Sequence, residues 1–78
     1  FLYTVQAGAF TNSDNAKVLQ KEIENAGMIS FIQDKNVAGT VFKVVFIGKF
    51  ETRKEAEDFL PIANTRFRIT GRVAEINQ

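Results

Sequence analysis

The sequence contains no cysteine, histidine or tryptophan, and only one proline. Without disulfides, a chain of 78 residues has to fold around one compact hydrophobic core. The lack of histidine and cysteine also removes the commonest general base, the commonest metal ligands and every thiol nucleophile. We therefore expect no enzyme, no metal site and no cofactor. The missing cysteines are compatible with either redox compartment.

The charge is nearly balanced, with a formal net charge of +1. No strong field would draw the chain to nucleic acid or to an anionic membrane. No apolar run reaches the roughly 18 to 20 residues that a transmembrane helix needs, so we expect no direct membrane contact. We expect residues 1–78 to form a single domain. Its strand-like start at Phe1 suggests a domain excised from a longer protein that carries any anchor or export signal.

Paired carboxylates could still perform acid–base chemistry, as they do in glycosidases. The carboxylates considered are Asp14, Glu22, Glu24, Glu51, Glu55, Glu57 and Asp58. They fall at predicted helix starts or on predicted helix surfaces, where capping and solvation explain them. Ser13 and Ser30 have no recognisable base beside them. Catalysis is not expected from this inventory.

Two halves of the chain repeat each other at an offset of 40 positions. Gly8, Phe10 and Ala16 match Gly48, Phe50 and Ala56. Each half is predicted to be a strand, a Gly-x-Phe turn and a helix, followed by a further strand. We expect the glycines to meet a backbone constraint at the turn and the phenylalanines to fill the core beneath the helices.

In the first half, residues 2–9 are predicted as a strand and residues 16–26 carry a helical apolar stripe. Thr11-x-x-Asp14 resembles a capping box, and Ser13 is an alternative N-cap. Gly27 should end the helix. Residues 28–33 are the next predicted strand, and residues 34–40 form its hairpin connection.

In the second half, residues 41–50 form the strongest predicted strand and Thr52-x-x-Glu55 is a capping box. The helical stripe that follows contains Pro61, which predicts a kink or an end near Leu60. The last strand is predicted at residues 73–76, with residues 67–69 as an alternative.

The order βαββαβ predicts an α+β fold of the ferredoxin-like or RNP-like type. Its four-stranded antiparallel sheet would carry both helices on one face. The other face would stay uncovered, which makes it the natural place for a ligand.

Strand alternation predicts which side chains reach that open face. With Val5, Ala7, Val45 and Ile47 assigned to the core, the open face receives Thr4, Gln6, Phe42, Val44 and Phe46. Aromatic rings beside an amide suit a glycan-like polymer, through stacking and directional hydrogen bonds. Alternatively, the same residues pack against a linker or partner chain. The aromatic signature of RNA-binding RRM domains is missing from residues 43–48, so nucleic acid is not an expected partner.

The chain resembles the SPOR domain family along essentially its whole length. The matching segments are Tyr3–Phe10, Asn15–Ala16, Ala26–Gly27, Phe42–Phe50 and Glu55–Ala56. The resemblance implies the same βαββαβ sheet and binding of peptidoglycan glycan strands, notably strands stripped of stem peptides at the division septum.

It further implies a non-catalytic module that localises a larger protein in the periplasm or cell envelope of a bacterium, with cell-division proteins as candidate partners. The alternative is a protein–protein interaction module that uses the apolar open face around Val44 and Phe46.

Residue by residue, the resemblance implies contacts from four positions. Gln6 matches the glutamine of the family's Val-Gln-x-Gly motif. Ala9 follows Gly8, where a hydroxyl is often found, and Phe42 keeps an aromatic ring. Val44 stands where the family often has a basic residue. The resemblance thus predicts the family's ligand with fewer polar contacts than a typical member makes.

Overall fold

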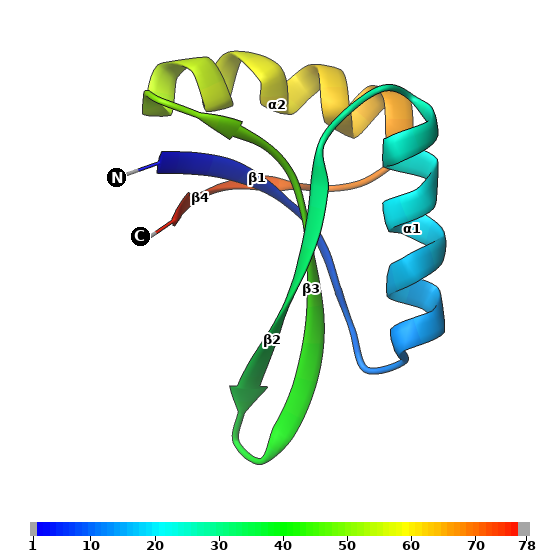
Figure 1. Ribbon diagram of the computed structural model, residues 1–78. Helices are drawn as coiled ribbons and strands as arrows, with labels where there is room; N and C mark the ends of the chain where they lie inside the picture. Colours follow the sequence, from blue (N-terminus) through cyan, green and yellow to red (C-terminus); the bar gives the residue numbers. More distant parts are fainter. Residues whose placement is uncertain (1, 77–78) are drawn as a thin grey trace.

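The structure is a computed structural model, and it describes residues 2–76. The elements along the chain are β1 (Leu2–Phe10), α1 (Ser13–Asn25), β2 (Ser30–Val37), β3 (Thr40–Phe50), α2 (Arg53–Phe67) and β4 (Arg72–Ile76) (Figure 1). The strands form one sheet in the order β2-β3-β1-β4, and every neighbouring pair is antiparallel. The predicted fold class is confirmed.

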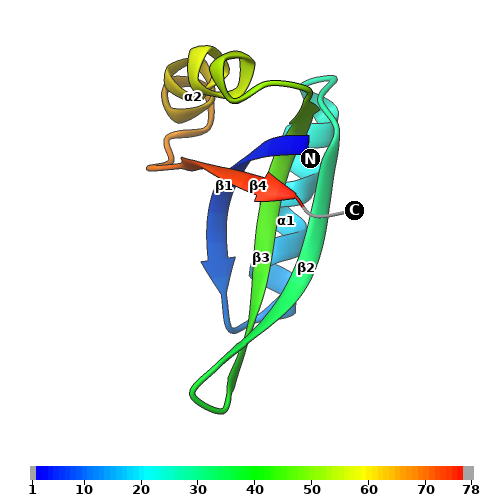
Figure 2. The ribbon, with the colours of Figure 1, turned by 90° about the vertical axis from the view of Figure 1, so that its left-hand side faces the viewer.

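Both helices lie on the same side of a strongly twisted sheet (Figure 1). Helix α1 packs against β1, β2 and β3, whereas α2 packs against β1, β3 and β4. Figure 2 views the sheet from its other side, with α1 behind the strands. Neither helix covers that side. In the described part of the chain, no helix has the length and apolar character to cross a membrane.

The core lies between the sheet and the helices, as predicted. Val5, Val45 and Ile47 are fully buried and Ala7 is nearly so. The fully buried helix residues are mostly small, namely Ala16, Ala56 and Ala63, with Ile23 of α1 as the one large side chain among them. Small side chains let helix backbones approach the sheet closely, and larger half-buried residues then fill the margins. Phe10 and Phe50 pack there, which confirms their predicted place.

The repeated Gly-x-Phe motif has a steric origin. A Cβ on Gly8 would lie 3.2 Å from the ring of Phe10, and a Cβ on Gly48 would lie 2.9 Å from the ring of Phe50. Each phenylalanine therefore folds back over the glycine two residues before it. Gly48 also has a φ of +73°, which favours glycine, whereas Gly8 is not among the residues with positive φ.

The β1–β3 ladder has two register shifts. Tyr3 pairs with Phe50 and Val5 with Ile47, so β3 has an extra residue there. Gln6 pairs with Phe46 and Gly8 with Val45, so β1 has an extra residue there. Each bulge lies at or beside the glycine of one Gly-x-Phe motif. Bulges increase local twist and bend a strand, which fits the curvature of this sheet.

The two helix starts differ. The capping box at Thr52 is confirmed, since the Thr52 hydroxyl accepts from the Glu55 N–H at 3.2 Å and the Glu55 carboxylate accepts from the Thr52 N–H at 3.2 Å. The first helix does not use Thr11 or Ser13 as its cap, so both predicted caps were wrong. Asn12 is the N-cap, and its side-chain oxygen accepts from the Asp14 N–H at 2.8 Å. At the other end, Gly27 follows the helix with a φ of +84°, as predicted.

The β2–β3 hairpin is longer than predicted. Strand β2 runs to Val37, which pairs with Thr40, so only Ala38 and Gly39 form the turn. Both turn residues have positive φ, at 52° and 85°, as a tight hairpin turn requires. Asn36 accepts a hydrogen bond from the Gly39 N–H at 3.1 Å. Residues 34–37, predicted as part of a loop, thus belong to the sheet.

Of the two alternatives predicted near Leu60, a kink or a helix end, the helix end was wrong. Helix α2 continues through Pro61 to Phe67 and ends at Arg68, which adopts the left-handed conformation. Proline removes one helical hydrogen bond to the carbonyl four residues earlier. Here Pro61 and Glu57 are both exposed, so water can solvate that carbonyl. The last strand is the predicted one, and residues 67–69 are excluded because Phe67 still lies in the helix.

Candidate functional site: the open sheet face

The open face is built from alternate residues of all four strands. They are Thr4, Gln6 and Ala9 of β1, Phe31, Gln33 and Lys35 of β2, Phe42, Val44 and Phe46 of β3, and Arg72 and Ala74 of β4. One row crosses the whole sheet, because Phe31 pairs with Phe46, Phe46 with Gln6, and Gln6 with Arg72. The predicted site residues therefore share one surface, and β2 and β4 extend it.

Two hollows lie on this surface and share Gln6, Lys35 and Val44. One has a volume of about 260 Å³ and is also lined by Gln33, Asp34, Phe46, Ala74 and Glu75. The other has a volume of about 190 Å³ and is also lined by Ala9, Val37, Phe42 and Arg72. Together they trace a concave path from the β2–β3 hairpin toward β4.

Two stacked aromatic rings lie on the open face. The rings of Phe31 and Phe46 stack with centroids 5.0 Å apart and planes 20° apart. The Lys49 ammonium lies 5.5 Å from the Phe31 ring centroid, in cation–π geometry. Both rings are half-buried. The stacked pair leaves ring surface accessible beside Gln6, where a flat apolar group of a ligand could pack.

Gln6 is the polar group best placed to bind a ligand. It lies opposite Phe46 on one side and Arg72 on the other, and it lines both hollows. Within residues 2–76 its side-chain amide makes no hydrogen bond. A half-buried amide with its donors and acceptor unused can offer directional hydrogen bonds to hydroxyl or acetamido groups.

Thr4, a predicted ligand-binding residue, is occupied by the fold. Its side chain is 0% exposed. The Thr4 hydroxyl donates toward the carbonyl oxygens of Gly48, at 2.7 Å, and Ile47, at 3.0 Å. These carbonyls belong to the β3 bulge, where the ladder leaves them short of partners. Thr4 thus stabilises the bulge and has no free surface to give a ligand.

Val44 and Ala9 pair with each other across the β1–β3 ladder. Val44 is 3% exposed and forms the floor of both hollows, so its side chain shapes the face more than it touches a ligand. Ala9 is exposed at the rim of the smaller hollow. Phe42 and Phe46 remain half-buried and accessible. Gln6, Ala9, Phe42 and Phe46 are thus the predicted residues that a ligand could reach.

Sequence reasoning missed several accessible residues of this face, among them Phe31, Gln33, Lys35 and Arg72. Lys35 was assigned to a loop, because the loop of the hairpin was predicted too long. Arg72 lies one residue before the predicted last strand. Phe31 was in a predicted strand, and its alternation with Gln33 could have placed it on the open face. Lys35 and Arg72 bring positive charge to this face. Its central strand β3 has the uncharged Val44 at the position where SPOR domains often have a basic residue.

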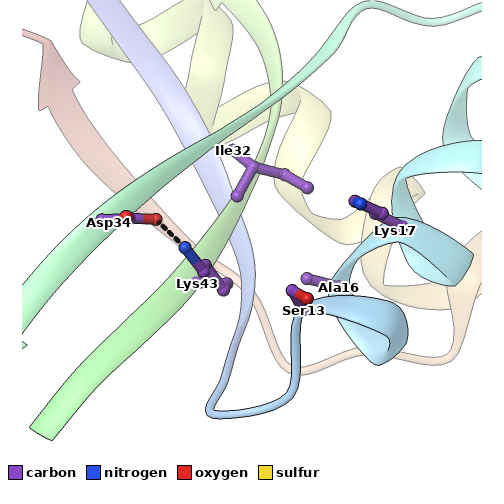
Figure 3. A pocket seen from close by; sticks show the side chains of 6 residues that line it. All are labelled: Ser13, Ala16, Lys17, Ile32, Asp34 and Lys43. Carbon is purple, nitrogen blue, oxygen red and sulfur yellow. Dashed lines mark hydrogen bonds and ion pairs between the residues drawn. The ribbon is translucent and has the colours of Figure 1, made fainter.

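A further hollow, of about 340 Å³, lies on the covered side between α1 and the hairpin. Ser13, Ala16 and Lys17 of α1 face Ile32, Asp34 and Lys43 of the strands (Figure 3). The Lys43 ammonium lies 2.7 Å from the Asp34 carboxylate, so its charge is already neutralised. None of the predicted site residues lines this hollow. We therefore assign the candidate site to the open face.

The described residues contain no cluster of three or more metal-ligating side chains. The chemistry of the open face is that of an amide, several phenyl rings and two cations on a curved antiparallel sheet. These groups offer ring stacking and directional hydrogen bonds along the sheet surface.

A sequence model of the SPOR domain family matches residues 1–66, and the chain therefore belongs to the SPOR domain family. No curated protein matches the chain by sequence.

Solved structures share the fold. The SPOR domain of RlpA from Pseudomonas aeruginosa is 19% identical and aligns with a TM-score of 0.78, over 97% of this chain and 100% of that chain. The peptidoglycan binding domain of the Bacillus subtilis cell wall lytic enzyme CwlC is 26% identical, with a TM-score of 0.72, over 97% of this chain and 90% of that chain.

The Spor protein DedD is 20% identical, with a TM-score of 0.66, over 94% of this chain but only 38% of that chain. The same fold thus occurs as part of a longer protein.

Proposed function

We propose that this domain binds peptidoglycan glycan strands across its open sheet face, with a preference for strands stripped of stem peptides. The observation that carries the proposal is the unused amide of Gln6 beside the stacked rings of Phe31 and Phe46. Sugar rings present an apolar face and a rim of hydroxyl and acetamido groups, which match aromatic rings and an amide respectively. Family membership and the peptidoglycan-binding domain of CwlC support the same ligand.

In this proposal the domain is a non-catalytic module. It localises a larger cell-envelope or cell-division protein in the periplasm or envelope, at sites where stem peptides have been removed. The absence of histidine and cysteine from the sequence supports a binding role over a catalytic one. Glycan cleavage by the purified domain would contradict it.

The alternative function, a protein–protein interaction module, required an apolar open face around Val44 and Phe46. The structure gives this alternative less support than the sequence did. Val44 is 3% exposed, and Phe46 stacks on Phe31. The accessible surface at the centre of the sheet therefore has mixed character, with Gln6, Gln33 and two cations around the rings. A contiguous exposed apolar patch, the usual mark of a protein contact, is not formed by these central residues.

Co-sedimentation with purified sacculi tests the proposal, before and after an amidase removes the stem peptides. We expect binding to increase after amidase treatment. Gln6→Ala and Phe42→Ala should each weaken binding about fivefold, as expected for about 1 kcal/mol of lost hydrogen bonding or stacking. Both should leave the melting temperature nearly unchanged, because neither residue belongs to the covered core.

The matched control is Gln20→Ala, which removes an amide from α1 on the opposite side of the sheet. It should bind as the unmodified domain does. Failure of the unmodified domain to bind either form of sacculi would refute the proposal. A large loss of thermal stability in Gln6→Ala or Phe42→Ala would instead show that these side chains hold the fold.

A further inference from the structure

Two cations enter the smaller hollow of the open face from opposite edges of the sheet. Lys35 comes from β2 and Arg72 from β4, which are the outer strands of the order β2-β3-β1-β4. Both side chains are exposed, and both line the hollow of about 190 Å³ with Gln6 and Phe42. Residues far apart along the chain thus place two positive charges around one concave surface.

Neither cation is neutralised within residues 2–76. The ion pairs there join Lys43 to Asp34 and Lys54 to Asp58. Asp34 and Glu75 line the neighbouring hollow, which Lys35 also lines. The Asp34 carboxylate is held by Lys43 at 2.7 Å, and Glu75 forms no ion pair with Lys35 or Arg72 within residues 2–76. No carboxylate lines the hollow that contains Lys35 and Arg72. An anionic group placed there would meet two unpaired cations.

We propose that Lys35 and Arg72 bind the carboxylates of the ligand and thereby make the domain selective for the charged form of the glycan. The inference rests on the proposed function. In an intact strand, the lactyl carboxyl of each muramic acid unit is an uncharged amide that links it to the stem peptide. Hydrolysis of that amide leaves a carboxylate on the sugar. A face with two cations therefore distinguishes stripped strands from intact ones by the carboxylate on the sugar itself, in addition to any steric effect of the peptide.

This arrangement supplies from the edge strands the positive charge that the central strand lacks at Val44. Arg72 presents a planar fork that can bind a carboxylate through two hydrogen bonds, whereas Lys35 acts as a mobile point charge. Because Arg72 pairs with Gln6 in the ladder, a carboxylate on Arg72 would lie beside the same sugar unit that the Gln6 amide contacts. Charge recognition and sugar recognition would then operate on one segment of the strand.

The test measures binding of the whole domain to amidase-treated glycan strands at low and high salt. A second sample of the same strands has its carboxylates coupled to methylamine, which leaves neutral amides. The unmodified domain should bind the charged strands about tenfold more tightly than the amidated ones at low salt. This difference should shrink toward 0.5 M salt, where the Debye length falls to about 4 Å.

The double variant Lys35→Gln with Arg72→Gln should bind charged strands about tenfold more weakly than the unmodified domain at low salt, with little dependence on salt. The matched control, Lys21→Gln with Arg66→Gln, removes the same charge from exposed positions on α1 and α2 and should keep the full affinity. Circular dichroism melting of both variants checks that the fold is retained.

The inference fails if the unmodified domain binds charged and amidated strands equally, or if the Lys35 and Arg72 variant keeps the original salt dependence. Glycan binding as such would survive either result. Absence of binding to both samples would refute the proposed function itself, and the inference with it.

Discussion

The two halves of the molecule have the same order of elements but use it differently. Gln6 lies directly opposite Phe46, its counterpart 40 positions later, across the central strand pair. The offset of 40 positions also maps the pair Tyr3–Phe50 onto the pair Lys43–Phe10. The sequence repeat is thus a two-fold-like relation between β1 and β3. Where the halves differ, the difference shows which residues serve the fold and which are free to serve a ligand.

The relation places an amide and an aromatic ring at equivalent positions at the centre of the open face. Gln6 and Phe46 pair with each other and each with one edge strand, yet one offers hydrogen bonds and the other offers ring surface. It also makes Thr4 the counterpart of Val44, and both are buried. The two halves therefore supply the same buried scaffold, and they differ in chemistry where a ligand can reach.

The largest expected difference between the halves concerns the two bulge glycines. Gly48→Ala should lower the free energy of unfolding by about 2 kcal/mol or more, because φ is +73° and the new Cβ would lie 2.9 Å from the Phe50 ring. Gly8→Ala should lower it by about 1 kcal/mol or less, since the backbone needs no positive φ and the Phe10 ring must shift only slightly. Urea denaturation of both variants measures the difference. Equal losses would show that ring contact, and not the backbone dihedral, dominates at both sites.

The helix starts allow a reciprocal exchange of one residue. Glu55 is the third residue of α2 and completes the capping box, whereas its counterpart Asn15 in α1 does not. Glu55→Asn should cost about 0.5–1 kcal/mol of stability, and Asn15→Glu should add about 0.5 kcal/mol by completing a box with Asn12 and by placing negative charge in the first turn. Thermal and urea unfolding of the two variants test this exchange.

The informative result is that the two substitutions should change the free energy of unfolding in opposite directions. If Asn15→Glu destabilises the domain, the first helix start has a geometry that a reciprocal box cannot fit. The two halves would then differ in backbone as well as in side chains at this point.

The sequence was sufficient for the fold because its signals were local and repeated. Strand alternation identified Val5, Val45 and Ile47 as core residues, and the spacing of Thr52 and Glu55 identified a helix start. Predictions failed where one local signal outweighed its surroundings. Pro61 was expected to kink or end the helix near Leu60, and α2 does not end there, because exposure of that helix face leaves the freed carbonyl in contact with solvent.

The candidate site was harder to predict, because strand pairing decides it. Alternation placed Thr4 and Gln6 on the same face, yet only the β3 bulge at Gly48 shows why Thr4 is committed to the fold. Likewise, Lys35 and Arg72 line one hollow although they come from β2 and β4, the two edge strands of the sheet. Such a juxtaposition depends on register and sheet curvature, which no local pattern in one sequence contains.

The smallest expected effect tests how far the two-fold relation extends. Thr4 donates to the carbonyls of Ile47 and Gly48, and the corresponding carbonyls for Val44 are those of Ala7 and Gly8. In Val44→Thr, a hydroxyl that reaches either carbonyl would be satisfied, so the stability should change by less than about 0.5 kcal/mol. A loss of about 1–3 kcal/mol in urea unfolding would indicate a buried hydroxyl without a partner. The β1 bulge would then present its carbonyls differently from the β3 bulge, as the absence of a positive φ at Gly8 already allows.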